Sequence, residues 1–187
     1  SGLAQCLVDA LGEKLNPIMR GTEPVDEKSY TTEAFAREAL SFIDSHQKDP
    51  FFVYLPFNSV HQPMQALEKY IARFSAIRDS KRRTFAGMLA CMDDAVGRVL
   101  TMIRDSNLEE NTLIFFISDN GGAYANAEMG GLRGHKWFVW EGGIRVSWIA
   151  AWKGHVPGGR VSAEPVIQLD VLRTALAAAG AEVKPEW

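Results

Sequence analysis

The sequence predicts an α/β domain built on a central, largely parallel β-sheet that is covered by helices. The strongest indication is a set of short, continuous apolar runs, which are typical of strands buried on both faces of a parallel sheet. These runs are Phe51–Leu55, Thr112–Ser118 and Val146–Ala151. Segments with the three-four apolar spacing of amphipathic helices alternate with them. With 187 residues, 47% hydrophobic and 23% charged, the chain can form one globular domain with a sizeable core.

The first half of the chain is expected to hold three helices and one of these strands. Residues 1–30 mix glycine, proline and charged side chains without periodicity, which indicates an irregular lead-in. Apolar spacing predicts a helix over about Thr32–His46, a short one over Leu67–Phe74 and a long one over Ser80–Asp105. The long helix carries one apolar stripe, formed by Phe85, Leu89, Met92, Val96, Val99 and Ile103.

The second half is expected to be rich in strands and to finish on a helix. Asn107–Asn111 is interpreted as the turn that leads into the strand Thr112–Ser118. A final helix is predicted over about Val166–Ala179, with Gly180 as its stop signal.

Charge and cysteine content exclude several classes of protein. The net charge is −3 and the longest basic run is Lys81–Arg83, so no nucleic-acid partner is indicated. No apolar stretch approaches the roughly 20 residues that a membrane span requires, and the first residues lack a signal core. If the protein is exported, we expect the signal to lie outside this sequence. The two cysteines, Cys6 and Cys91, are far apart and belong to no CxxC pair.

Four polar residues follow apolar strands or lie on the glycine-rich loop between two of them. Ligands of open α/β sheets bind beyond the carboxyl ends of the strands, which directs attention to His61 after the first strand and to Asp119 and Asn120 after the second. Lys136 lies on the glycine-rich loop. Each has an ordinary alternative: Asp-Asn-Gly-Gly is a common turn, and a loop histidine or a surface lysine is unremarkable. Their combination favours an anion-binding enzyme site.

The residues around these four resemble the sulfatase family, within the alkaline phosphatase superfamily. The resemblance rests on the order and spacing of several segments and covers about Thr31–Gly180. It implies an alkaline-phosphatase-like fold that is incomplete here, with residues 31–187 as the later portion of a sulfatase catalytic domain. The segments are PFFVYLPFNSVHQP (50–63), MDDAVGRVLTMI (92–103), NTLIFFISDNGG (111–122), LRGHKWFVWEGGIRV (132–146) and AWKGHVPGGRVSAEPV (151–166).

The resemblance implies a role for each of the four residues. Asp119 and Asn120 would bind a divalent cation, usually calcium in this family, although a carboxylate and an amide oxygen also suit magnesium or manganese. Lys136 and His61 would contact the sulfate near its leaving oxygen. Cleavage of the sulfur–oxygen bond loads charge on that oxygen, and a protonated histidine or lysine relieves it by donating a proton.

The implied site is incomplete in this sequence. Calcium takes six to eight oxygen ligands, and the family places its remaining acidic ligands in an N-terminal segment. The nucleophile there is a formylglycine made from a Cys or Ser in a Cys/Ser-x-Pro-x-Arg motif. Neither Cys6 nor Cys91 is followed by that Pro and Arg, and Cys91 is interpreted as core on the long helix. We therefore expect no sulfatase activity from this chain alone, and self-association through uncovered sheet or apolar faces.

The neighbours of Lys136 depart from the Gly-Lys-Gly-Thr that is usual in the family. His135 would add a second imidazole to the site, and Arg133 would be a secondary anion ligand. Trp137 and Trp140 either pack in the core, the commoner role, or form an aromatic wall that stacks on a sugar or aryl group. Two further pairs are interpreted as structural: Asp93–Asp94 as helix-surface or inter-helix contacts, and Glu141–Arg145 as a salt bridge.

Two classes of function compete with a sulfatase. Phosphodiesterases, phosphonate hydrolases and phosphatases of the superfamily share the sheet and metal site, but usually have Asp-His where this chain has Asp119-Asn120. A non-catalytic module that has kept the fold is the second alternative. The resemblance also implies a sulfated small molecule or carbohydrate as the substrate, and a periplasmic, secreted or lysosomal location.

Overall fold

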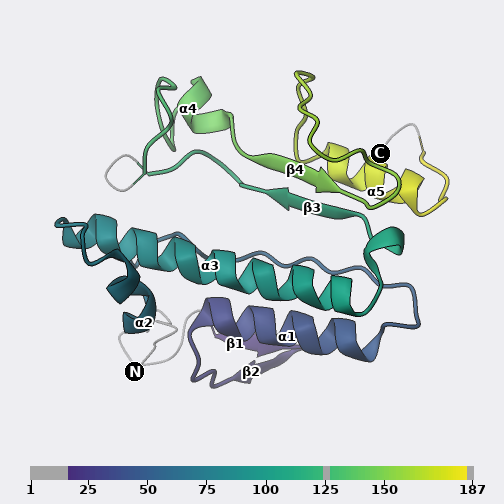
Figure 1. The fold of residues 1–187 in the computed structure, drawn as a ribbon, viewed down its shortest axis with the longest axis horizontal. Coiled ribbons are helices and arrows are strands. Elements are labelled where there is room, and N and C mark those ends of the chain that lie inside the picture. Colours follow the sequence, from purple (N-terminus) through teal and green to yellow (C-terminus); the bar gives the residue numbers. More distant parts are fainter. Residues whose placement is uncertain (1–16, 124–126, 185–187) are drawn as a thin grey trace. The chain divides into compact units, whose positions relative to one another are not determined.

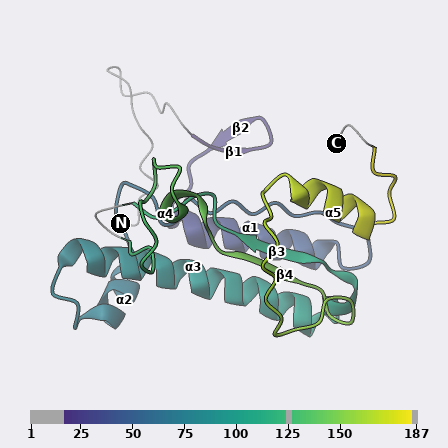
Figure 2. The same cartoon turned by 90° about the horizontal axis from the view of Figure 1, so that it is seen from above.

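The computed structural model describes residues 17–123 and 127–184. Two compact units divide the chain, residues 1–106 and residues 107–187, and each is described by itself. Figures 1 and 2 show the elements of both units in two perpendicular views. No helix in the described part of the chain is both long and apolar enough to cross a bilayer.

The first unit begins with a β-hairpin, where the sequence predicted an irregular lead-in. Strand β1 (Ile18–Arg20) pairs antiparallel with β2 (Glu23–Val25). The two-residue turn between them starts at Gly21, whose φ of 61° suits a hairpin turn and costs glycine little. The prediction for residues 17–30 is therefore wrong in part, because a single turn glycine outweighed the lack of periodicity. The prediction for residues 1–16 lies outside the described residues.

Helices α1 (Thr31–Ser45) and α3 (Ser80–Asp105) match their predicted bounds closely and run side by side in Figure 1. The side chain of Asp79 caps α3 by accepting a hydrogen bond from the Arg82 amide at 2.7 Å. Helix α2 (Glu68–Ile71) and a following 3₁₀ turn, Ala72–Phe74, confirm the predicted short helix.

The buried face of α3 differs from the predicted stripe. Leu89 of that stripe is 45% exposed, whereas Cys91 and Ala95 are fully buried. Ile103 of the stripe is buried, at 4% exposure, so the prediction is correct in part. The small side chains carry little weight in a hydropathy pattern, which explains why they were not predicted. The core side chains of this unit are Tyr30, Thr32, Ala34, Ala36, Ala39, Ile43, Tyr70, Met88, Ala90, Cys91, Ala95 and Ile103.

The predicted strand Phe51–Leu55 is not a strand in the structure. Its backbone is extended, and the exposed Phe52 (76%) and Tyr54 (79%) alternate with half-buried neighbours. Within the described residues no segment pairs with it, and a strand requires a hydrogen-bonded neighbour.

The second unit contains one antiparallel strand pair, β3 (Ile114–Ile117) and β4 (Trp148–Ala151). Two strands were therefore predicted correctly. The predicted parallel sheet is not seen among the described residues, whose sheets are both two-stranded and antiparallel. A short helix, α4 (Glu141–Ile144), precedes β4, and α5 (Asp170–Ala178) ends just before Gly180, which has a φ of 70°.

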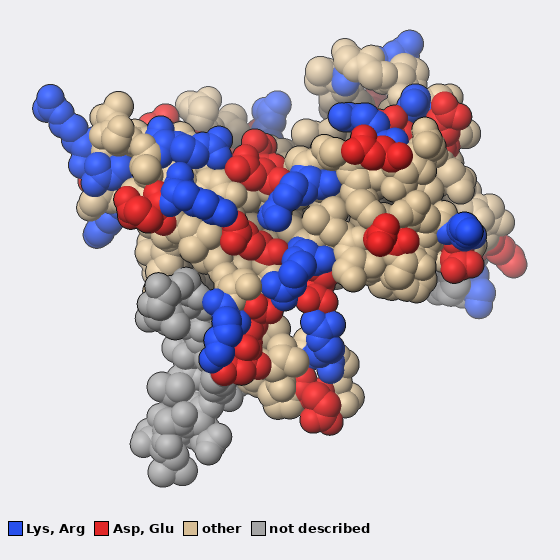
Figure 3. All heavy atoms as spheres, turned by 60° about the horizontal axis from the view of Figure 1, so that its bottom comes forward, with Lys and Arg blue, Asp and Glu red and all other residues tan. Residues whose placement is uncertain are grey.

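Charges are mixed on the face shown in Figure 3, where Lys and Arg side chains lie among Asp and Glu side chains. The first unit contains ion pairs between such side chains, among them Arg37–Glu27 at 2.7 Å and Lys69–Glu33 at 2.6 Å. This face offers no single-sign stripe of the kind that binds nucleic acid.

Candidate functional site

Strand β3 carries Asp119 and Asn120 directly beyond its carboxyl end, as the sequence predicted. Their side chains converge: the Asn120 amide donates a hydrogen bond to Asp119 Oδ2 at 2.6 Å. The Ser118 hydroxyl donates to the Asn120 carbonyl at 3.1 Å and fixes the turn that presents them. Asp119 is exposed and Asn120 half-buried. A carboxylate and an amide side chain thus lie side by side beyond the strand.

Lys136 is held beside this strand end by backbone hydrogen bonds. Its amide donates to the Gly122 carbonyl at 3.0 Å, two residues beyond Asn120. The Gly121 amide donates to Gly143 at 2.9 Å, and the Gly142 amide donates to Arg133 at 2.8 Å. The segment after β3, the lysine loop and helix α4 are therefore connected through main-chain atoms. Asp119, Asn120 and Lys136 are brought into one neighbourhood.

These connections leave no room for side chains at three glycines. A Cβ on Gly121 would lie 1.9 Å from the Gly142 carbonyl oxygen, and one on Gly143 would lie 1.9 Å from that of Phe138. A Cβ on Gly142 would lie 2.2 Å from the Gly134 oxygen. Real Cβ atoms essentially never come so close to backbone oxygens. Close backbone packing therefore requires glycine at positions 121, 142 and 143.

Arg133 and the loop aromatics form a stacked cluster. The Arg133 guanidinium lies 3.7 Å from the centroid of Trp140, and the ring of Phe138 stacks on Trp140 at 5.1 Å. His135 meets Phe138 edge to face at 4.7 Å, and its Nδ1 lies 2.7 Å from the Lys136 carbonyl. Trp140 therefore stacks within the loop but stays 41% exposed, so it is not a core residue. Cation–π contact holds Arg133 over the ring.

Trp137 does not pack in this way. Its side chain is 88% exposed and its φ is 85°. The Phe138 amide donates to the His135 carbonyl at 3.0 Å, closing a four-residue turn with Lys136 and Trp137 at its centre. Such a φ at the third residue is typical of a type II turn, where glycine is preferred. A bulky residue held there costs about 1–3 kcal/mol.

Gln168 is a positioning residue that the sequence analysis missed. Its side-chain amide donates long hydrogen bonds to the carbonyl oxygens of Ser118 (3.3 Å) and Asp119 (3.4 Å). Gln168 falls inside the predicted last helix, Val166–Ala179, but the observed helix begins at Asp170. The signal was present in Asp170, whose side chain accepts from the Ile167 amide at 2.8 Å and marks the helix start.

His61 lies in the first unit, on the exposed loop after Phe51–Leu55. Its Nδ1 is 3.0 Å from the Gln62 carbonyl, and its amide donates to Asn58 at 3.1 Å. The backbone contact leaves Nε2 available to another group. Its place beside Lys136 stays a prediction.

The donor set at Asp119 and Asn120 fits part of a metal site. A carboxylate oxygen and an amide, side by side, are what a hard cation takes as neighbouring ligands. Amide oxygen and nitrogen differ only by a rotation, so the contact at 2.6 Å turns into a pair of oxygen donors when Asn120 flips. Across residues 17–123 and 127–184, no group of three or more His, Cys, Asp or Glu side chains surrounds such a point. Further ligands are needed.

The interpretations of Cys91 and of two polar pairs are confirmed. Cys91 is fully buried in the core, and burial raises the pKa of its thiol, which opposes nucleophilic use. Asp94 forms an inter-helix ion pair with Arg73 at 3.1 Å. Arg145 donates to Glu141 at 3.1 Å across one turn.

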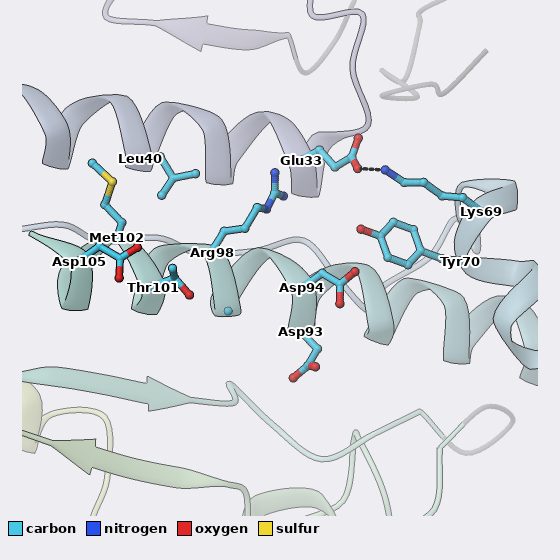
Figure 4. A pocket seen from close by; sticks show the side chains of 11 residues that line it. Glu33, Leu40, Lys69, Tyr70, Asp93, Asp94, Arg98, Thr101, Met102 and Asp105 are labelled. Carbon is cyan, nitrogen blue, oxygen red and sulfur yellow. Dashed lines mark hydrogen bonds and ion pairs between the residues drawn. The ribbon is translucent and has the colours of Figure 1, made fainter.

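A pocket of about 830 Å³ lies elsewhere, in the first unit between α1, α2 and α3 (Figure 4). Glu33 and Lys69 form an ion pair at its rim, and Asp93, Asp94 and Arg98 line it from α3. None of the predicted site residues is among its lining residues. Its open, mixed-charge surface is unlike an enclosed substrate cleft.

Comparison with known proteins identifies the family. The family model described as Sulfatase matches residues 9–181. The pig (Sus scrofa) N-acetylgalactosamine-6-sulfatase is 35% identical over 162 residues, which are 83% of this chain and 30% of that protein. The arylsulfatase of Hemicentrotus pulcherrimus is 34% identical, over 82% of this chain and 27% of its own length. The chain thus spans about a third or less of these curated relatives.

Solved structures agree with the family model. The crystal structure of Ps i-CgsB in complex with k-i-k-neocarrahexaose superposes with a TM-score of 0.89 at 37% identity, over 96% of this chain and 40% of that one. The PsFucS1 sulfatase from Pseudoalteromonas sp. has a TM-score of 0.71 at 26% identity, over 84% of this chain and 32% of its own. From its sequence and its fold, this chain belongs to the sulfatase family.

Proposed function

We propose that this chain is part of the catalytic domain of a sulfuric ester hydrolase, and that it supplies one wall of the active site. The observation that carries the proposal is the main-chain hydrogen bond from the Lys136 amide to the Gly122 carbonyl, which connects the lysine loop to the segment that bears Asp119 and Asn120. A site for a sulfate ester needs positive charge on more than one side of the anion, which the Lys136 ammonium and a cation held by Asp119 and Asn120 would supply together.

Asp119 and Asn120 are proposed to hold a divalent cation, calcium in the first instance and otherwise magnesium or manganese, together with ligands from outside the described residues. The bound cation supplies charge stabilisation to the sulfuryl oxygens. Lys136 contributes a compact ammonium to the same oxygens and needs no planar partner geometry. The exposed imidazole of His61 is proposed to donate a proton to the ester oxygen as the sulfur–oxygen bond breaks.

The nucleophile is proposed to be a formylglycine in a part of the full-length protein outside these residues. The buried Cys91 is unsuited to that role, and Cys6 lies outside the described residues. This assignment keeps the expectation that the 187-residue chain alone turns over no sulfate ester.

A sulfated carbohydrate is the proposed substrate. Two of the similar proteins have names that point this way: an N-acetylgalactosamine-6-sulfatase, and a structure determined with k-i-k-neocarrahexaose. The periplasmic, secreted or lysosomal location that the resemblance implies is part of the same proposal.

The test uses the longest open reading frame that contains this segment, assayed on a panel of sulfated oligosaccharides and on an aryl sulfate. Lys136→Ala is expected to lower kcat/KM by about 10²–10³-fold, the usual effect of removing one charge-stabilising donor. Lys153→Ala is the matched control, because Lys153 is an exposed lysine of the same unit that pairs with Glu109 at 3.1 Å. Equal activity of the two variants would refute the role of Lys136.

Two further readouts separate the sulfatase from its alternatives. Removal of divalent cations by a chelator, followed by addition of calcium, magnesium or manganese, is expected to abolish activity and then restore it with the native metal. Phosphate mono- and diesters are assayed beside the sulfate esters. Faster turnover of phosphate esters favours a phosphodiesterase-type enzyme, and turnover of neither class favours a non-catalytic module.

A further inference from the structure

We infer that Trp137 is a saccharide-stacking residue, which binds the face of the sugar ring whose sulfate ester meets Lys136. The inference rests on the proposed function and deepens it, since it names the residue that selects a sulfated sugar ring over a bare sulfate. It is carried by the position, exposure and backbone of Trp137 together.

Trp137 has an unusual backbone conformation. Trp137 follows Lys136 in the turn closed by the Phe138 amide and the His135 carbonyl, and its φ of 85° belongs to the region that glycine prefers. A tryptophan at such a position is strained, and strained residues cluster where a site needs them. Packing does not explain the strain, because the side chain is 88% exposed.

The aromatic side chains of the loop differ in their contacts. Phe138 and Trp140 stack on each other, and Arg133 covers Trp140 at 3.7 Å, so these side chains support the loop. Trp137 stands outside that stack. Trp137 is therefore the most exposed of these three aromatic side chains, at 88% against 42% for Phe138 and 41% for Trp140.

The charge of Lys136, next to Trp137, indicates which ligand the indole would bind. The Lys136 ammonium lies 5.6 Å from the centroid of the Trp137 ring, so one ligand can meet both groups. The ammonium requires an anion, and the negative face of an indole favours the weakly positive C–H groups of a ring laid against it. A sulfated pyranose offers both features within a single residue, whereas inorganic sulfate offers only the first.

Replacement by glycine tests this directly in the full-length protein. Trp137→Gly removes the indole and restores the residue that the turn prefers, so the Tm is expected to rise by about 1–4 °C. The KM or Kd for a sulfated oligosaccharide is expected to rise about three- to tenfold. Inhibition by inorganic sulfate, which needs no stacking surface, is expected to stay unchanged. A purely structural tryptophan would not separate these three readouts.

Two variants complete the design. Trp137→Phe retains an aromatic face and is expected to bind the oligosaccharide within about twofold of the unmodified protein. Val161→Ala changes an apolar side chain that is 97% exposed and lies outside the loop, and it is the control for exposure alone.

The outcomes distinguish the inference from the proposed function. Unchanged oligosaccharide affinity in Trp137→Gly overturns the inference and leaves sulfatase activity untouched. A fall in Tm also overturns it, because the indole then packs against another part of the full-length protein. Absence of sulfate-ester hydrolysis, combined with Trp137-dependent binding of the oligosaccharide, refutes the proposed activity and supports the stacking role.

Discussion

The two units of this chain are held together in different ways. In the first unit, apolar side chains of α1, α2 and α3 are buried against one another, with Ile43 and Cys91 almost fully enclosed. In the described part of the second unit, the residues classed as buried are Gly142 and Gly143, and large apolar side chains such as Ile149 and Val161 are exposed. Within the described residues, side-chain packing holds the first unit together, and main-chain contacts shape the Lys136 loop of the second.

The difference teaches where the chemistry is placed. A loop fixed through its own backbone positions Lys136 without using its side chain, which stays available to a ligand. In a helical core such as that of α1 and α3, the buried side chains contact one another and are not available to a ligand. The candidate site residues Asp119, Asn120 and Lys136 accordingly belong to the unit with the fewest buried side chains.

Gly143→Ala is the largest expected effect and tests whether the second unit depends on its backbone. The new Cβ would lie 1.9 Å from the Phe138 carbonyl oxygen, so the loop must move. We expect a loss of about 4 kcal/mol or more in unfolding free energy, or a folded protein without activity. Denaturant unfolding of the full-length protein measures it.

Gly97→Ala is the matched control for that substitution. Gly97 lies in α3, and a Cβ there meets nothing within 4 Å. Alanine is a better helix former than glycine, so the free energy of unfolding is expected to increase by about 0.5–1 kcal/mol. An increase in stability from Gly143→Ala as well would contradict the claim that the second unit depends on close backbone contact.

Ile43→Ala tests the packed core of the first unit. Ile43 is 1% exposed, and truncation of such a side chain costs about 2–5 kcal/mol. Ile149→Ala provides the same change at a residue of β4 that is 55% exposed, where less than about 0.5 kcal/mol is expected. Thermal unfolding measures both variants. A similar loss of stability at the two positions would show that another part of the full-length protein covers β4.

The smallest expected effect concerns Glu27, which makes the stability of the first unit depend on pH. The Arg37 guanidinium and then the Ser29 amide, both at 2.7 Å, lower the pKa of Glu27 to about 2. Since the folded pKa lies below the unfolded value, the stabilisation is present above about pH 4.5 and is lost as the pH falls towards 2. With Arg37 half exposed, the loss is about 1 kcal/mol or less.

Glu27→Gln is expected to remove this extra acid sensitivity, as measured by unfolding between pH 5 and 2. Glu141→Gln is the counterpart in the second unit, where the pair with Arg145 is exposed on both sides and contributes roughly 0.3–0.5 kcal/mol. An equal acid response from both variants would contradict the assignment to Glu27.

Local patterns determined most of the secondary structure. The bounds of α3, the strands β3 and β4, and the stop at Gly180 follow from apolar spacing, apolar runs and a glycine, all of which act over a few residues. The placement of Asp119 and Asn120 at a strand end was predicted for the same reason, and the motif order predicted the family that the comparisons confirmed.

Only the tertiary structure decided which surfaces meet. It buried the small residues Cys91 and Ala95 of α3 beside Met88 and Ile103, and it paired β3 antiparallel with β4. It left Phe51–Leu55 without a partner among the described residues. It also placed Trp140, which is 41% exposed, in a stack with Phe138 and left Trp137, which is 88% exposed, outside that stack. Pairing, burial and close backbone approach depend on residues far apart in the chain, so no local pattern encodes them.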